Sequence, residues 1–245
     1  RAIFENIRKF LTYILTSNVP ELVPYLAFAF ARVPLALTIV QILAVDLGTD
    51  MVPALGLGAE PPADEVMRRP PRSRQDRLLT PALLVRVYLF LGVLEAVAAM
   101  AAFFFVLVGA GWQWGEMLSP NDLLYRQATT ACLTAVVIVQ VVNVHLCRSR
   151  RRSVLSRPLF DNHLITTGNF AEVALVLLIV YTAGGNAVFG TAPIGYRVWL
   201  FVVPFALVML MLEEGRKAIV RWRESGTIAS AGSRSTKPAT MAGRS

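Results

Sequence analysis

The sequence predicts an all-α membrane protein that crosses the bilayer with six transmembrane helices. Of its 245 residues, 55% are hydrophobic and only 16% are charged, a composition typical of polytopic membrane proteins. Six apolar stretches are each long enough to span a bilayer, which requires about 20 such residues. Arginine-rich loops lie between alternate stretches, as they do on the cytoplasmic side of membrane proteins.

The expected helices cover about 8–31, 34–57, 82–109, 126–147, 163–183 and 197–219. Basic residues crowd the loops after the second and fourth helices and the segment after the sixth, whereas 110–125 and 184–196 contain no lysine or arginine. This asymmetry predicts a multi-pass protein with both termini in the cytoplasm. We expect residues 1–224 to form the membrane domain and 225–245, rich in small polar residues, to form a disordered cytoplasmic tail.

Other residue patterns exclude several classes of protein. The net charge of +8 lies beside membrane spans, so we assign it to topology and expect no nucleic-acid partner. Cys132 and Cys147 fall in one apolar stretch, which fits neither a disulfide framework nor a metal motif. The first residue is Arg1 rather than methionine, so we expect a piece of a longer protein.

Acidic residues interrupt the second apolar stretch. Asp46 and Asp50 lie one helical turn apart near its middle, with Thr49 beside them. A carboxylate at membrane depth costs roughly 2.5–3.5 kcal/mol, so packing does not explain two of them. Gly48 and Pro53 loosen the backbone at the same place. We interpret this stretch as half of a cation site.

The first stretch carries a second polar centre. Asn18 and Glu21 are three residues apart and therefore share a helix face. Pro20 and Pro24 each remove a backbone hydrogen bond at about the same depth. Because the turn to the second helix is very short, the two helices must be antiparallel neighbours whose polar centres can face each other. We therefore predict that two of the six helices are kinked or unwound at an ion site.

Three carboxylates inside the membrane would together cost roughly 7–10 kcal/mol, which is comparable to the stability of a whole domain. Protons, water or a bound cation must neutralise them. Oxygen ligands suit Na⁺, K⁺, Ca²⁺ or H⁺ better than thiophilic metals. The predicted ligands are Asn18, Glu21, Asp46, Thr49 and Asp50. The alternative is a polar contact between helices in which the carboxylates stay protonated.

Polar residues elsewhere in the spans are further candidates. Glu172 in the fifth stretch is a candidate because a charged side chain inside a membrane is functional by default. Gln140 and Asn143 in the fourth stretch are either ligands or hydrogen-bonding contacts between helices. Glu95 has no polar neighbour in its own stretch, so we leave it out of the site.

Several motifs resemble the C-terminal membrane region of P-type cation ATPases, in the branch of the sodium/potassium and reticulum calcium pumps. The most specific are TSNVPELVPYL at 16–26, DLGTDMVPALGLGAEPP at 46–62 and MRRPPR at 67–72. The likeness continues through VQVVNVHLCRSRRRSV at 139–154 and LEEGRKAIVRWR at 212–223. It therefore covers nearly the whole chain to about residue 224.

The resemblance implies that these helices are the fifth to tenth of ten in an ATP-driven translocase. The transported cation (Na⁺, K⁺ or Ca²⁺) would then be held by Asn18, Glu21, Asp46, Thr49 and Asp50, with Ser17 nearby. A further cation position would be lined by Tyr13, Thr16, Gln140, Asn143 and Glu172. The segment 61–77 would couple the membrane sector to the phosphorylation domain. Mg²⁺ and ATP would belong to the actuator, phosphorylation and nucleotide domains, which are the expected partners together with the lipid bilayer.

Some residues depart from the family's patterns. Asp46 matches the sodium/potassium type, whereas reticulum calcium pumps have asparagine there. Gln140 stands where those calcium pumps have glutamate. Asn143 replaces an aspartate of the sodium pump, and Glu95 replaces a glutamine. Ser17 stands where gastric proton/potassium pumps have lysine, which argues against a proton pump of that type. The identity of the ion therefore stays open.

The chain contains no DKTGT phosphorylation motif, TGE segment or GDGxND hinge. We therefore expect no catalytic residue in this chain and no ATP hydrolysis by it alone. The loop 110–125 is short, so we expect no beta subunit and a bacterial plasma membrane. The alternatives are a self-contained proton-coupled or cation secondary transporter or channel, and a non-catalytic fragment that pairs with separate ATPase subunits.

Overall fold

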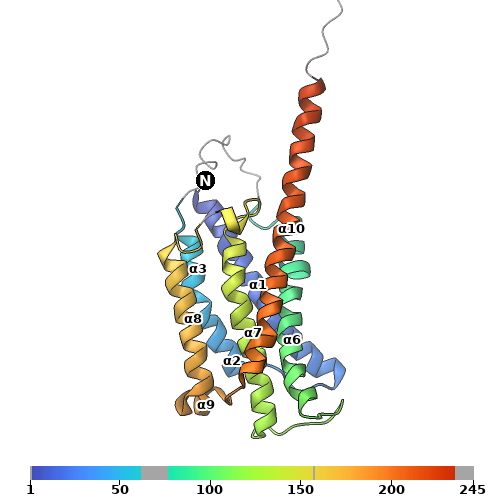
Figure 1. The fold of residues 1–245 in the computed structure, drawn as a ribbon, viewed down its shortest axis with the longest axis vertical. Helices are drawn as coiled ribbons and strands as arrows, with labels where there is room; N and C mark the ends of the chain where they lie inside the picture. The colour runs from blue at the N-terminus through green and yellow to red at the C-terminus, as the bar shows by residue number, and fades with distance from the viewer. Residues whose placement is uncertain (1, 62–76, 157, 235–245) are drawn as a thin grey trace, which may run out of the picture.

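The computed structural model describes residues 2–61, 77–156 and 158–234, with backbone only for 224–234. Within these ranges the chain is helical and has no strand. Six helical segments are long and apolar enough to cross a membrane, which confirms the predicted fold class. They form an upright bundle, with the N-terminus and the far end of α10 on the same side (Figure 1).

Four of the six spans are single helices, and two are composite. The first span is α1 (Ala2–Ala31), followed by a second span of α2 (Ile39–Leu43), η1 (Ala44–Thr49) and α3 (Met51–Gly58). The third joins α5 (Pro81–Leu84), η2 (Val85–Leu91) and α6 (Gly92–Gly109). The others are α7 (Leu123–Cys147), α8 (His163–Tyr181), which is followed by the short α9 (Ala183–Phe189), and α10 (Tyr196–Arg234). Both η segments are π-helical.

Some boundaries differ from those expected. The second span begins at Ile39 rather than 34, because Arg32 has a left-handed φ of 53° and Thr38 forms a capping box with Gln41. The expected loop 184–196 contains most of α9. The helix α10 continues to Arg234, beyond the expected end at 219 and into the segment 225–245 that is expected to form a tail. Residues 235–245, and the predicted coupling segment from 62 to 76, lie outside the described residues.

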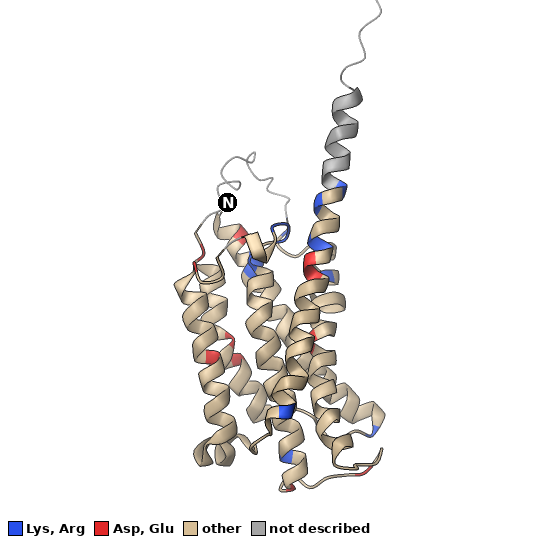
Figure 2. Cartoon of the chain, in the orientation of Figure 1, with Lys and Arg blue, Asp and Glu red and all other residues tan. Residues whose placement is uncertain are grey.

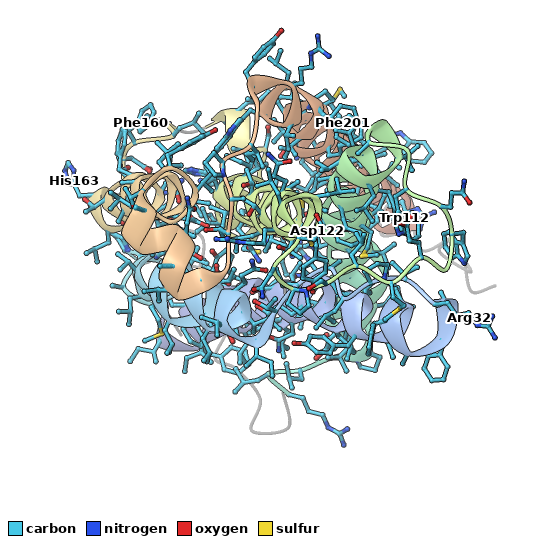
Figure 3. All side chains as sticks on the ribbon, turned by 90° about the horizontal axis from the view of Figure 1, so that it is seen from below. Arg32, Trp112, Asp122, Phe160, His163 and Phe201 are labelled. Atoms are coloured by element: carbon cyan, nitrogen blue, oxygen red, sulfur yellow. The ribbon has the colours of Figure 1, made fainter. Side chains whose placement is uncertain are left out.

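The helix α7 is the centre of the bundle. In the 18-residue apolar stretch of α7 that could cross a membrane, 78% of the residues are buried, which is the highest share among the six spans. Viewed along the bundle, Asp122 at the start of α7 lies near the middle, whereas Arg32 and His163 lie at the rim (Figure 3). Alanine, threonine and valine dominate the buried residues of α7, and such small side chains allow neighbouring helices to approach closely.

Glycines bring α8 against the second span. A Cβ atom at Gly168 would lie 2.8 Å from the backbone nitrogen of Pro53. A Cβ atom at Gly56 would lie 2.9 Å from the backbone nitrogen of Ile165. Neither contact leaves room for a side chain, so these glycines determine how close α3 and α8 can be.

Ion pairs hold the end of the bundle at which the chain begins, where basic residues gather (Figure 2). Glu60, just after α3, pairs with Lys9 of α1 at 2.7 Å and with Arg148 after α7 at 2.8 Å. Arg148 also pairs with Asp161 at 2.7 Å. Burial alone would lower the pKa of Arg148, but the carboxylates of Glu60 and Asp161 raise it above its ordinary value. The network therefore joins four spans.

A second buried ion pair fastens α10 to the third span. Arg86 in η2 donates to Glu213 at 2.6 Å and to the carbonyl of Leu146 at 3.3 Å. Arg216 donates to both oxygens of Glu213, at 2.7 Å each. Three spans are therefore joined around one carboxylate.

Candidate cation site

The site is built around Asp50, which is only 1% exposed and lies directly after η1. Its carboxylate accepts hydrogen bonds from Ser17 Oγ at 2.5 Å and from Tyr13 Oη at 3.2 Å, both on α1. Thr49 Oγ1 donates to it at 3.4 Å. Hydroxyl oxygens from two neighbouring spans therefore surround one buried carboxylate.

The π-helical segment η1 determines where Asp50 lies. The Asp50 amide donates to the carbonyl of Val45 at 2.9 Å, five residues earlier, and Thr49 Oγ1 donates to the same carbonyl at 2.9 Å. Single π-helical turns occur frequently at functional sites. In the first span the helix is continuous through Pro20 and Pro24. A bend at these prolines stays a prediction.

Glu21 and Asp46 lie beside Asp50. Glu21 is 9% exposed and interacts electrostatically with both aspartates, while Asp46 is partly buried. Glu21 Oε1 is buried without a hydrogen-bond partner in the described part of the chain. No described lysine or arginine pairs with any of the three acids. Acidic side chains in such surroundings require a proton or a cation, because unpaired buried charge is costly.

Two predicted ligands behave differently from the rest. Asn18 is exposed although Glu21, three residues later, is buried. The structure therefore does not bring Asn18 to Asp50. Thr16 is fully buried, but its hydroxyl donates to the carbonyl of Thr12 in its own helix at 2.7 Å.

The candidates on α7 form a second polar group. Gln140 Nε2 donates to Glu95 Oε2 at 3.3 Å, and Asn143 Nδ2 donates to Gln140 Oε1 at 3.3 Å. Cys147 Sγ donates to Asn143 Oδ1 at 3.4 Å. Sequence reasoning left Glu95 out, because its partner lies on a different helix. The glutamate in place of the family's glutamine was the available signal.

Glu172 on α8 interacts with members of both groups. Its side chain is fully buried, and neither carboxyl oxygen has a hydrogen-bond partner among the described residues. It interacts electrostatically with Tyr13, Asp50 and Glu95. Gly168, one turn earlier, places this face of α8 directly against Pro53. The structure thus brings Glu172 near the site without bonding it to the other members.

Among the residues that the structure describes, no three or more His, Cys, Asp or Glu side chains form a group that could hold a metal ion. A cation beside Asp50 would therefore take hydroxyl, amide or carbonyl oxygens together with the carboxylates. Such a mixed set of oxygens, with no sulfur or imidazole, suits hard cations.

Sequence comparisons agree with this chemistry. The profile of the family described as "Cation transporting ATPase, C-terminus" matches residues 34–219. The chain belongs to the cation-transporting ATPase family. The chain is 31% identical over 253 residues to "Sodium/potassium-transporting ATPase subunit alpha" of Tetronarce californica. The alignment covers 93% of the chain and 25% of that protein.

Two further relatives have the same coverage. The alpha-1 subunit of Anguilla anguilla is 32% identical and the alpha-3 subunit of Homo sapiens is 31% identical to the chain. The chain thus spans about a quarter of the length of these relatives. The family inferred from the sequence motifs is confirmed, and the six apolar helices make the chain a multi-pass membrane protein.

Proposed function

We propose that this chain is the C-terminal membrane sector of an ATP-driven P-type pump and that it binds the transported cation beside Asp50. The observation that carries the proposal is a buried carboxylate that accepts hydrogen bonds from the Ser17 and Tyr13 hydroxyls and has Thr49 Oγ1 3.4 Å away, with Glu21 and Asp46 beside it and no basic partner among the described residues. The family match supports the same conclusion.

The proposed cation is Na⁺ or K⁺, with Ca²⁺ as the alternative. Relatives named as sodium/potassium-transporting ATPases support the alkali cations. The proposed ligands are Asn18, Glu21, Asp46, Thr49 and Asp50, with Tyr13, Thr16, Ser17, Gln140, Asn143 and Glu172 in a supporting role. Asn18 would join only if α1 rotated or another part of the protein covered its exposed face.

The arrangement supports transport by alternating access. Ser17 and Tyr13 reach Asp50 from a different span, so a shift of α1 against η1 would change the number of oxygens around the cation. The cation would then bind more tightly in one arrangement than in the other, which is what drives a population shift. Bound Mg²⁺ and ATP would supply phosphoryl transfer in the remainder of the protein, and no residue of this chain takes part in that chemistry.

The proposal includes an orientation. The basic end of the bundle, with both chain ends, would face the cytoplasm, since positive charge accumulates there. The short connection between α6 and α7 supports a pump without a beta subunit, as in a bacterial plasma membrane.

The test is Asp50→Asn in the full-length protein, with ATPase activity titrated separately with Na⁺, K⁺ and Ca²⁺. We expect the cation concentration for half-activation to rise by about 100-fold or more, because losing a buried charged ligand costs roughly 3 kcal/mol. Asp122→Asn is the matched control, since Asp122 caps α7 far from the site. Unchanged cation dependence in both Asp50→Asn and Asp46→Asn would contradict the proposal, and cation flux without ATP would favour a secondary transporter or channel.

A further inference from the structure

The connection after α6 contains a tight turn that the proposed cation site does not use. We call residues 111–116 the tryptophan turn. Gly111 and Gly115 have positive φ angles of 86° and 89°, a backbone conformation that glycine adopts at little cost. The indole N–H of Trp112 donates to the carbonyl of Glu116 at 2.9 Å and closes the turn. The turn therefore has one defined conformation, although it lies in a loop.

Three aromatic rings form a cluster at this turn. Trp112 is only 8% exposed and packs into the core of the bundle. The Trp114 ring stacks on the Phe104 ring with 5.9 Å between their centroids, and it lies 5.9 Å from the Trp112 ring. Trp114 nevertheless remains 66% exposed. The cluster thus holds an indole ring in place while it leaves most of the surface of that ring open.

An exposed acid lies beside this exposed ring. Glu116 Oε2 accepts a hydrogen bond at 3.2 Å from the backbone amide of Gln113, directly before Trp114. No ion pair with Glu116 occurs in the described part of the chain, and the connection 110–125 contains no lysine or arginine. The face of a tryptophan ring attracts cations more strongly than those of the other aromatic side chains. The acid and the ring therefore both favour a positively charged partner.

The position of the turn indicates which cation reaches it. The turn follows α6, which ends the most apolar of the six spans, and Trp112 lies at the rim of the bundle in the view along its axis (Figure 3). Tryptophan side chains at the ends of membrane spans lie at the level of the lipid headgroups. The phosphate of an anionic headgroup would be repelled by Glu116. An ethanolamine or choline headgroup carries an ammonium group that both Glu116 and Trp114 attract.

We propose that the tryptophan turn binds the ammonium group of a zwitterionic phospholipid. The open face of the Trp114 ring covers the ammonium group, and the Glu116 carboxylate pairs with its charge. The acyl chains of the same lipid lie along the apolar surface of α6, where Phe105 and Val108 are exposed. The proposal rests on the membrane-spanning helices and not on the proposed cation site.

The test is photo-crosslinking of the full-length protein in phosphatidylglycerol nanodiscs. The nanodiscs contain a small fraction of one of two probes, phosphatidylethanolamine or phosphatidylglycerol, with the same photoreactive group in the acyl chain. Peptide mapping is expected to show that the tryptophan turn is labelled preferentially by the ethanolamine probe. Glu116→Gln and Trp114→Leu are each expected to lower this preference by about two- to fivefold, the size of an exposed cation–π contact or ion pair. A preference that neither variant changes would refute the proposal.

Matched variants separate recognition of the headgroup from general effects. Asp122→Asn neutralises another acid of the same connection, one that caps α7, and Trp222→Leu removes a 77% exposed tryptophan from α10. Both are expected to keep the preference of the wild type, and equal losses in these controls would refute the proposal. Glutamine retains the oxygen that accepts from Gln113, so Glu116→Gln is expected to fold. A preference lowered by Trp114→Leu but not by Glu116→Gln would leave only an apolar anchor, and would also refute the proposal.

Two further arms identify the source of the ammonium group and separate this proposal from the cation site. An excess of free ethanolamine is expected to leave the labelling unchanged, because the lipid headgroup is held at the turn by its acyl chains. Loss of labelling would mean that the turn binds a soluble amine, and would refute a lipid as the occupant. Asp50→Asn is expected to keep the labelling preference of the wild type, so failure of the proposed function leaves this result intact.

Discussion

At the scale of single residues, Asp50 is defined by the hydroxyl groups that face it. Ser17 and Tyr13 lie one helical turn apart on α1 and donate to the two different oxygens of one carboxylate. A hydrogen bond to a charged group stabilises by about 1.5–3 kcal/mol. These two residues therefore hold Asp50 in one orientation, and a cation would find the carboxylate already positioned.

Ser17→Ala tests this orientation. Removing the hydroxyl leaves Asp50 with one donor fewer, so we expect the cation affinity to fall by about 10- to 100-fold. The measurement is a titration of cation-dependent ATPase activity in the full-length protein. Thr12→Val is the control, because Thr12 Oγ1 donates only to the Arg8 carbonyl, at 2.7 Å. Equal losses in both variants would mean that the effect comes from α1 in general.

Glu60 is expected to stabilise the folded protein through its ion pairs with Lys9 and Arg148. In Glu60→Gln, Lys9 and Arg148 lose their shared carboxylate, and breaking a buried ion pair typically costs about 3–5 kcal/mol. Because Asp161 still pairs with Arg148, we expect a loss of roughly 2–3 kcal/mol in unfolding free energy. Glu116→Gln is the exposed control, and equal denaturation midpoints for the two variants would contradict this account.

The pH dependence of the same network follows from Arg148. Its pKa is raised in the folded protein, so its contribution is complete below the unfolded pKa and is lost only as the pH rises through the folded one. Both values lie in the strongly alkaline range. We therefore expect the difference between wild type and Glu60→Gln to stay constant from about pH 7 to 9, as measured by denaturation at each pH. A difference that vanished within this window would exclude Arg148 as the partner.

At the scale of helices, the contact between α3 and α8 depends on glycine. Glu172 reaches the neighbourhood of Asp50 because α8 lies directly against Pro53 at Gly168. The backbone on the other side of this contact cannot move aside as a flexible side chain would. The distance between α3 and α8 therefore depends on the absence of a side chain at Gly56 and Gly168.

Gly168→Ala is the corresponding test. Its Cβ atom would lie 2.8 Å from a backbone atom, so the helices must separate, at a cost of about 1–3 kcal/mol. Gly58→Ala, at the end of α3, meets nothing within 4 Å and is expected to be neutral or stabilising by about 0.5–1 kcal/mol. Thermal unfolding in lipid nanodiscs compares them, and equal midpoints would contradict the close contact.

At the scale of the whole molecule, the distribution of charge predicts how the bundle lies in the membrane. Basic residues gather at the end that carries the start of the chain (Figure 2). The connection between α6 and α7, at the other end, contains no lysine or arginine. We therefore expect the basic end of the bundle to face the cytoplasm.

Cysteine labelling measures this orientation. Ser119→Cys and Ser156→Cys place thiols at exposed positions on opposite ends of the bundle. We expect an impermeant reagent added to intact cells to label the first, and to label the second only after permeabilisation. The native Cys132 and Cys147 are buried, which keeps the background low. The reverse pattern would invert the proposed topology.

Much of this fold could be predicted because a bilayer constrains spans by length and apolarity. The contact between α1 and Asp50 followed from the short connection between the first two spans. Helical spacing placed Asn18 and Glu21 on one face. It could not reveal that Glu21 is buried while Asn18 is exposed. Glu95 was missed because its partner Gln140 lies 45 residues away on another helix.

Two backbone features could not be predicted from the sequence. The seven residues of α9 are rich in glycine, which argues against a helix. Arg126 of α7 stabilises this region by donating to the carbonyls of Asn186, at 2.9 Å, and Thr191. The π-helical form of η1 depends on the hydrogen bond from the Asp50 amide to Val45, whereas Gly48 indicated only that the helix could be irregular.

The π-helical turn in the second span amounts to one surplus residue accommodated within a regular coil. Relative to an uninterrupted α-helix, one surplus residue turns the side chains after it by about 100° around the axis, the angular step of one residue. Asp46 lies inside this turn and Asp50 lies directly after it. The directions in which these two acids leave the helix axis therefore differ from those that regular helical spacing would give.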